Sequence, residues 1–230
     1  MKFLRLKKHR VRADGVRSVL PVIVEKNRKF GLTLSEQKIS VRQDVLITGA
    51  HQAGKTRWLS RMEEEAAGIW RNKPVVMLRV VNPLISWVHN DAISGFGEEM
   101  LGKPWTKTRC WERSKVLVEW VRVNKAVVLI DDADKLSSRK LDIALQVLRV
   151  SGQAVVTASH ENRLPVSFRM VLQSRNPQRI NLKTDAPYDV TVVVVWFLSL
   201  AAMSAGAWQL AAVIAGLNMF KSGRRAARQT

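Results

Sequence analysis

Between residues 44 and 182 the chain alternates short apolar runs with longer segments in which apolar residues recur every three or four positions. The short runs are apolar on both faces, which is typical of strands buried inside a parallel sheet. We therefore predict strands at DVLITG (44–49), KPVVMLRVV (73–81), KAVVLIDDAD (125–134), GQAVVTASH (152–160) and QRINL (178–182). The longer segments have the period of amphipathic helices, which predicts helices over 54–70, 110–124, 136–150 and 166–174.

This alternation predicts the fold class. Strands that alternate with helices form a parallel sheet with helices on both faces, so we expect a three-layer α/β/α domain with a mainly parallel five-strand sheet. In the helix predicted over 110–124, Val116, Trp120 and Val123 share one face and are expected to be buried. The region 84–108 has no regular pattern, and no element is predicted there.

The end of the chain has a different pattern. Residues 190–220 contain no charged side chain over 31 positions. As a single helix this run would be about 46 Å long, whereas the hydrocarbon core of a bilayer is about 30 Å thick. Because Gly206 divides the run into two halves, we expect a hydrophobic helical hairpin that associates with a membrane. One tilted span and a buried helix pair are the alternatives.

Positive charge is concentrated at the two ends. The chain carries a net charge of +19; residues 1–43 hold twelve basic and three acidic residues, and the tail KSGRRAARQT holds four basic residues and no acid. A basic tail favours the cytoplasmic side of a membrane. Basic termini also attract polyanions, so DNA or anionic lipid is the expected partner there, with a solvated arm as the alternative.

A phosphate-binding pattern follows the first predicted strand. The pattern G-x-x-x-x-G-K-[ST] is matched in full by Gly49, Ala50, His51, Gln52, Ala53, Gly54, Lys55 and Thr56. Its glycines allow a sharp turn and leave backbone N–H groups free to approach phosphate. Lys55 would reach the terminal phosphates, and Thr56 would place its hydroxyl on Mg²⁺. The sequence thus predicts a site for ATP and Mg²⁺, with an accidental glycine turn as the alternative.

The predicted strand over 125–134 ends in acidic residues. Asp131 follows VVLI and is expected at the carboxyl end of a buried strand, beside the phosphates, where it would hold Mg²⁺. Asp132 would orient or deprotonate the attacking water; a helix cap or a surface acid is its alternative role. Asp134 is expected to cap the helix that begins at Leu136.

With these motifs in this order, residues 44–182 resemble the additional-strand P-loop ATPases, in particular the AAA+ type. The resemblance implies a polar residue at the tip of the fourth strand that senses the γ-phosphate. Ser159 is the first candidate, Thr157 matches the same position, and Asn162 is held in reserve. Together with Lys55, Asp131 and Asp132, Ser159 completes the set of candidate catalytic residues.

The resemblance also implies an arginine that one subunit offers to the nucleotide of its neighbour. Arg169 and Arg175 are the candidates, and surface arginines without such a role are the alternative. AAA+ ATPases usually carry Glu where this chain has Asp132, which is one methylene shorter. Two consecutive Asp residues at this position also resemble the pattern of the signal-transduction (STAND) ATPases, which often act as slow switches. The resemblance therefore implies slow hydrolysis.

Cysteine and tryptophan add two further expectations. Cys110 is the single cysteine, so the chain cannot form an internal disulfide, and a reducing compartment is expected. Trp87 and Trp105 lie in the unassigned region 84–108. They are candidates for stacking on nucleic-acid bases, with burial in the core or at a subunit contact as the alternative.

These features divide the chain into four parts. We expect a basic N-terminal region at 1–43, a P-loop ATPase domain at 44–186, a membrane-associated segment or hairpin at 187–220 and a basic cytoplasmic tail at 221–230. The ATPase domain is expected to face the cytoplasm at a bacterial inner (cytoplasmic) membrane.

The expected function is that of a membrane-associated ATPase whose nucleotide state controls self-association or contacts with a protein partner. The chain resembles helper ATPases of mobile elements, which bind ATP, assemble and contact DNA; the basic N-terminal region would then face DNA. A membrane-anchored ATPase for secretion, conjugation or filamentous-phage export is one alternative. A nucleotide-gated recruitment module that does not hydrolyse ATP is the other.

Overall fold

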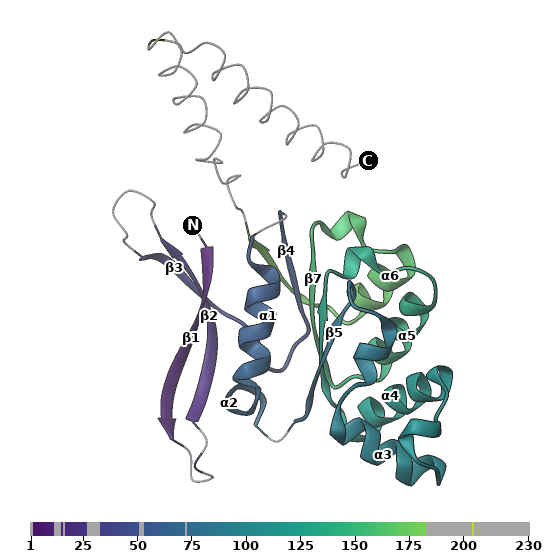
Figure 1. Ribbon diagram of the computed structural model, residues 1–230. Coiled ribbons are helices and arrows are strands. Elements are labelled where there is room, and N and C mark those ends of the chain that lie inside the picture. The colour runs from purple at the N-terminus through teal and green to yellow at the C-terminus, as the bar shows by residue number, and fades with distance from the viewer. Residues whose placement is uncertain are drawn as a thin grey trace. The chain divides into compact units, whose positions relative to one another are not determined.

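The computed structural model divides the chain into two compact units, Met1–Thr184 and Asp185–Thr230. It describes residues 2–11, 15, 17–26, 33–50, 53–71, 73–182 and 204 (Figure 1). The predicted membrane segment and basic tail lie outside the described residues, except for Ser204. Within the described part of the chain, no helix is both long and apolar enough to cross a bilayer.

A five-strand parallel sheet forms the centre of the first unit (Figure 1). Its strands are β4 (Val45–Gly49), β5 (Val75–Arg79), β6 (Val127–Asp131), β7 (Gln153–Ala158) and β8 (Gln178–Leu182). They lie in the order β5-β6-β7-β4-β8, and every neighbouring pair is parallel. The predicted five-strand sheet is therefore confirmed, and β7 separates β4 from β6.

Helices connect these strands. The α-helices are α1 (Lys55–Glu64), α2 (Ala66–Trp70), α3 (Asp91–Leu101), α4 (Cys110–Asn124), α5 (Ser138–Val150) and α6 (Val166–Ser174). Short 3₁₀ turns are η1 (Leu84–Val88), η2 (Trp105–Lys107), η3 (Ala133–Lys135) and η4 (Glu161–Arg163). The helix predicted over 54–70 is interrupted at Glu65, and the region 84–108, for which no element was predicted, contains η1, α3 and η2.

The sheet has a separate apolar core on each face. Val128 and Ile130 of β6 belong to the cluster that includes buried residues of α4, α5 and α6. Val127 and Leu129 belong to the cluster that includes residues of α1 and α2. Because neighbouring residues of a strand point to opposite faces, this alternation shows the predicted three-layer α/β/α arrangement.

The buried face of α4 differs from the prediction at one position. Val116 and Trp120 are buried as expected, but Val123 is 57% exposed. The buried stripe is centred on Leu117 and Val121, so Val123 lies at its edge, in the last turn of the helix.

The N-terminal region contains a second sheet, which the sequence patterns did not predict. Its antiparallel strands are β1 (Lys2–Val11), β2 (Arg17–Lys26) and β3 (Thr33–Lys38), in that order. Leu4, Val19 and Ile23 lie in the same apolar cluster as residues of α1 and α2. The described part of this basic region is therefore a sheet packed on the α1–α2 side of the domain rather than a solvated arm.

Candidate nucleotide-binding site

The glycines at the end of β4 and the start of α1 have different physical roles. A Cβ at Gly49 would lie 2.9 Å from the Cβ of Leu182 and 3.0 Å from its carbonyl oxygen. Glycine therefore permits the close approach of β4 and β8. Gly54 has φ +81° and directly precedes α1, a left-handed conformation that glycine adopts without steric cost.

The start of α1 is suited to an anion. The N-terminal residues of a helix have backbone N–H groups without helical partners, and the helix dipole is positive there. Gly54 supplies no side-chain cap to α1, so a bound phosphate could take these N–H groups. In the same loop, Ala50 is exposed and Ala53 half-buried, and the Ala53 N–H donates to the Ala50 carbonyl (3.2 Å). His51 and Gln52 lie outside the described residues.

Lys55 points back into the loop. Its Nζ donates to the carbonyl oxygens of Gly49 (2.8 Å) and Ala50 (2.9 Å), and the residue is only 7% exposed. Thr56, the next residue of α1, is exposed. The loop therefore brings a buried ammonium group and an accessible hydroxyl to the carboxyl end of the parallel sheet.

Three carboxylates share this electrostatic environment. Burial is the largest influence on Lys55 and lowers the pKa of its ammonium group. The carboxylates of Asp132, Asp134 and Asp131 act in the opposite direction and favour the charged form. The acids at the end of β6 and in the turn after it thus lie close enough to the loop lysine to affect its titration, as expected for a shared site.

Asp131 is the last residue of β6 and is 5% exposed. Its Oδ1 accepts a hydrogen bond from the hydroxyl of Thr157 on β7 (2.7 Å). The same hydroxyl oxygen accepts a bond from the backbone N–H of Asp132 (3.0 Å). Thr157, one of the three candidates for sensing phosphate, therefore fixes the orientation of Asp131 and the start of the following turn.

Asp132 is held by a neighbouring lysine. Its backbone is left-handed (φ 56°, ψ 47°), and its Oδ2 lies 2.6 Å from Nζ of Lys135. This hydrogen bond is the main cause of a raised pKa for Lys135. The carboxylate predicted to orient water is thus engaged in an ion pair.

Asp134 does not cap the helix as predicted. The helix α5 begins at Ser138 and has Ser137 at its N-cap position. Asp134 instead lies in η3, where its Oδ2 accepts a hydrogen bond from the Ser159 hydroxyl (2.5 Å), while its Oδ1 is buried without a hydrogen-bond partner among the described residues. The prediction was wrong because α5 begins later than the apolar pattern indicated.

Ser159 lies at the tip of β7, next to the phosphate-binding loop. Its carbonyl oxygen accepts a hydrogen bond from the backbone N–H of Gly49 (3.3 Å), and its hydroxyl is directed to Asp134. Asn162, the reserve candidate, is exposed in η4. The structure therefore brings Ser159, rather than Asn162, into contact with both the loop and the acids.

The oxygen groups at this edge fit Mg²⁺. The ion prefers oxygen ligands and is usually held by one or two carboxylates together with substrate phosphates. Asp131, the unpartnered Oδ1 of Asp134 and the exposed Thr56 hydroxyl supply such groups. Among the described residues, no group of three or more His, Cys, Asp or Glu side chains could hold a metal ion.

Arg175 is not available to a neighbouring subunit. Its guanidinium pairs with the buried Asp44, and it also donates to the carbonyl oxygens of Leu148 (2.5 Å) and Ser151 (3.1 Å). This network joins the start of β4 to the ends of α5 and α6. The expectation for Arg175 was therefore wrong, because the side chain is part of the internal packing; Arg169 is half-buried on α6.

The two tryptophans that are candidates for base stacking differ in burial. Trp87 is 2% exposed, and its Nε1 donates to the carbonyl of Arg79 (2.9 Å). Trp105 is half-buried and has the Arg113 guanidinium 5.1 Å from its ring centre. The candidate role in stacking was therefore wrong for Trp87, which is buried, and stays a prediction for Trp105.

The comparisons with known proteins are distant. No protein-family model and no curated protein matches the chain. Among solved structures, domain III of the Thermotoga maritima replication initiation protein DnaA has 16% identity and a TM-score of 0.39, over 61% of this chain and 54% of that one. Cdc6p from Pyrobaculum aerophilum has 18% identity and a TM-score of 0.38, over 60% and 38%.

A third similar structure is a STAND protein with a tetratricopeptide repeat sensor from Pyrococcus horikoshii, with 18% identity and a TM-score of 0.36, over 77% of this chain and 26% of that one. This chain therefore matches about half the length of the DnaA domain and less of the other two.

Proposed function

We propose that the chain is an ATP-binding P-loop ATPase that hydrolyses ATP slowly and whose nucleotide state controls self-association or contacts with a partner. One observation carries this proposal. The buried ammonium of Lys55 lies in a glycine loop at the carboxyl edge of a parallel sheet and interacts electrostatically with Asp131, Asp132 and Asp134. This combination of loop, lysine and acids supports binding of a nucleoside triphosphate with Mg²⁺.

The residues of the loop would bind and orient the phosphates. Lys55 would exchange its bonds to the loop carbonyls for phosphate oxygens, and the N–H groups at the start of α1 would donate to the same ligand. Thr56 and Asp131 would hold Mg²⁺, which neutralises phosphate charge when bound. Thr157 keeps the Asp131 carboxylate oriented.

Slow hydrolysis follows from the state of Asp132. A carboxylate orients or deprotonates water best when its oxygens are free to accept a hydrogen bond. One oxygen of Asp132 already accepts from Lys135. The same contact favours a second candidate function, a nucleotide-gated recruitment module that binds ATP without turnover.

Attachment to a bacterial inner membrane belongs to the proposal. The charge-free run 190–220 and the basic tail after it support this location. The basic N-terminal region is compatible with two biological roles for such an ATPase. One is a helper ATPase of a mobile element that contacts DNA. The other is a membrane-anchored ATPase for secretion, conjugation or filamentous-phage export.

The first test measures ATP affinity and ATP turnover of the full-length protein, with Lys55→Ala beside it. We expect Lys55→Ala to abolish both, because the loop loses the only ammonium that lies within it among the described residues. Unchanged affinity in this variant would remove the nucleotide-binding proposal. Tight binding without turnover in the unmodified protein would favour the recruitment module, and turnover that rises with double-stranded DNA would favour the mobile-element helper over the export ATPase.

A further inference from the structure

A cationic cavity lies at the edge of the sheet opposite the phosphate-binding loop. Its volume is about 370 Å³, and its described lining residues are Val41, Arg42, Ile69, Trp70, Arg71 and Lys73. Arg42 precedes β4 and Lys73 precedes β5, so these cations lie at the amino ends of the parallel strands. The loop, Asp131 and Ser159 lie at the carboxyl ends.

The charges of this cavity are not compensated within the described structure. Two guanidinium groups and one ammonium group line it, and the described lining residues include no acid. All three residues are exposed, and none of their side chains forms an ion pair or hydrogen bond with another described residue. These three unpaired cations come from two segments of the chain, and such a cluster attracts anions.

The segment that carries Arg42 is fixed in place. On β7, the Gln153 Nε2 donates to the carbonyl oxygens of Ser40 (3.1 Å) and Gln43 (2.7 Å), which flank Arg42. The Oε1 of the same Gln153 accepts from the Trp70 Nε1 (3.0 Å), at the floor of the cavity. One buried amide thus holds the rim and the floor together, so a ligand would meet a backbone that is already positioned.

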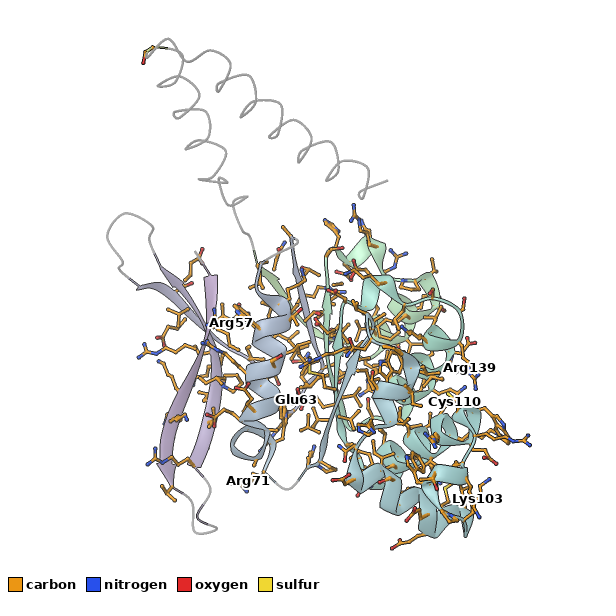
Figure 2. All side chains as sticks on the ribbon, viewed as in Figure 1. Arg57, Glu63, Arg71, Lys103, Cys110 and Arg139 are labelled. Carbon is orange, nitrogen blue, oxygen red and sulfur yellow. The ribbon has the colours of Figure 1, made fainter. Side chains whose placement is uncertain are left out.

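Arg71 has a backbone conformation that favours glycine. Its φ is 58° and its ψ is −122°, in a region where a Cβ is strained. The side chain is exposed (Figure 2) and contributes no described contact to the packing of the domain. An arginine at this position therefore lowers the stability of the fold, and its packing does not offset this cost. The property that remains to explain the arginine is its positive charge.

We propose that this cavity binds phosphate groups of a nucleic-acid backbone. One arginine guanidinium group can donate two parallel hydrogen bonds to a phosphate. A nucleic-acid duplex presents closely spaced phosphates. A bilayer is the less suitable partner, because the strength of membrane binding rises with the apolar area buried in the lipid as well as with charge. Ile69 and Trp70 are buried, and none of the exposed large apolar residues in the described part of the chain lines the cavity.

The test compares two triple variants of the full-length protein, kept in mild detergent, for binding to a fluorescently labelled DNA duplex. The first carries Arg42→Ala, Arg71→Gly and Lys73→Ala. The second, a control of equal charge, carries Lys107→Ala, Arg139→Ala and Arg149→Ala, three exposed residues outside the cavity and the nucleotide site. Arg139 lies well away from Arg71 (Figure 2).

We expect the cavity variant to lose about tenfold or more in affinity at low salt, and its salt dependence to fall, because each lost phosphate contact lowers the slope of log K against log salt by about 0.9. The control should bind as the unmodified protein does. Arg71→Gly alone should weaken binding while the melting temperature stays the same or rises, since glycine relieves the backbone strain. ATP affinity should be unchanged in all variants, so this test is independent of the nucleotide site.

Three results would overturn the proposal. Equal affinity of the cavity variant and the unmodified protein would show that the cavity does not bind DNA. Equal losses in the cavity variant and the control would assign binding to overall charge. Binding to phosphatidylserine vesicles but not to DNA, with loss in the cavity variant, would make a lipid headgroup the ligand.

Discussion

The hydroxyl of Thr157 is the clearest case of one group that positions another in this molecule. It donates to Asp131 and accepts from the N–H of Asp132, and the residue is fully buried. Valine has nearly the same shape but cannot make either bond. A hydrogen bond to a charged group contributes about 1.5–3 kcal/mol, so its loss affects both stability and the orientation of Asp131.

We therefore expect Thr157→Val to lower the free energy of unfolding by about 1–3 kcal/mol and to reduce ATP turnover more than ATP affinity. Urea denaturation and steady-state kinetics measure the two effects. Thr157→Ser keeps the hydroxyl and should retain most of the turnover. If valine and serine reduce turnover equally, the hydroxyl has no positioning role.

Lys135 offers a second prediction, because it engages the acid that would act on water. The side chain of Lys135 is half exposed, and such an ion pair contributes up to about 1 kcal/mol, which corresponds to roughly fivefold in rate. Lys135→Ala should raise ATP turnover by about two- to fivefold if Asp132 orients water. Lys107→Ala, at an exposed lysine of η2, should leave turnover unchanged. A fall in turnover in Lys135→Ala would assign a direct role to the lysine instead.

The individual motif residues could be predicted from the sequence, but their contacts could not. Gly54, Lys55 and Asp131 follow from a local pattern, because loop and strand end are defined by neighbouring residues. The bond from Ser159 to Asp134 joins positions 25 residues apart. Such bonds depend on which strands are neighbours, which a single-sequence pattern does not contain.

Among the elements, the packing of α2 on β2 depends on one small residue. A Cβ at Gly68 would lie 2.6 Å from Cγ2 of Val19 and 2.7 Å from the carbonyl oxygen of Arg17. Both distances are too short, and the second involves backbone, which cannot rotate away. Glycine at position 68 therefore permits the helix to lie against the N-terminal sheet.

Gly68→Ala should lower the free energy of unfolding by about 1–3 kcal/mol, as overpacked sites do. Gly95→Ala is the matched control, because Gly95 lies within α3 and a Cβ there would meet nothing within 4 Å. The control should be stabilised by about 0.5–1 kcal/mol, since alanine favours helix. Thermal unfolding of both variants checks the pair; equal stability would show that α2 and β2 do not pack closely.

The elements also differ in how well the sequence predicted them. The bounds of α4 and α6 agree with the helices predicted over 110–124 and 166–174, because each carries a regular apolar stripe. In α3, Gly95 and Gly97 interrupt the apolar period, so no helix was predicted. The strand β1 alternates apolar with basic residues and pairs with β2 through contacts such as Leu4 with Ile23. From its charge we predicted contacts with a polyanion, with a solvated arm as the alternative, and no strand was predicted, because only pairing and packing identify the apolar face.

In the first unit, the two sites lie at opposite edges of one sheet and share a strand. Gln153, the first residue of β7, holds the rim of the cationic cavity, and Thr157 on the same strand holds Asp131. Four residues of strand span about 13 Å. The strand β7 is buried along its whole length, so the position of the rim and that of the Asp131 carboxylate are set by one element.

The last prediction concerns the whole chain and its proposed attachment to a membrane. A run of 31 residues without charge should partition strongly into a bilayer, so full-length protein should sediment with membranes and need detergent for extraction. Removal of residues 187–230 should release the protein from the membrane. Removal of 221–230 alone should weaken only the attraction between the basic tail and anionic lipid, which salt screens. Sedimentation with membranes at low and high salt separates these cases. If the full-length protein stays in the supernatant without detergent, the run does not enter a membrane, and a buried helix pair becomes the better interpretation.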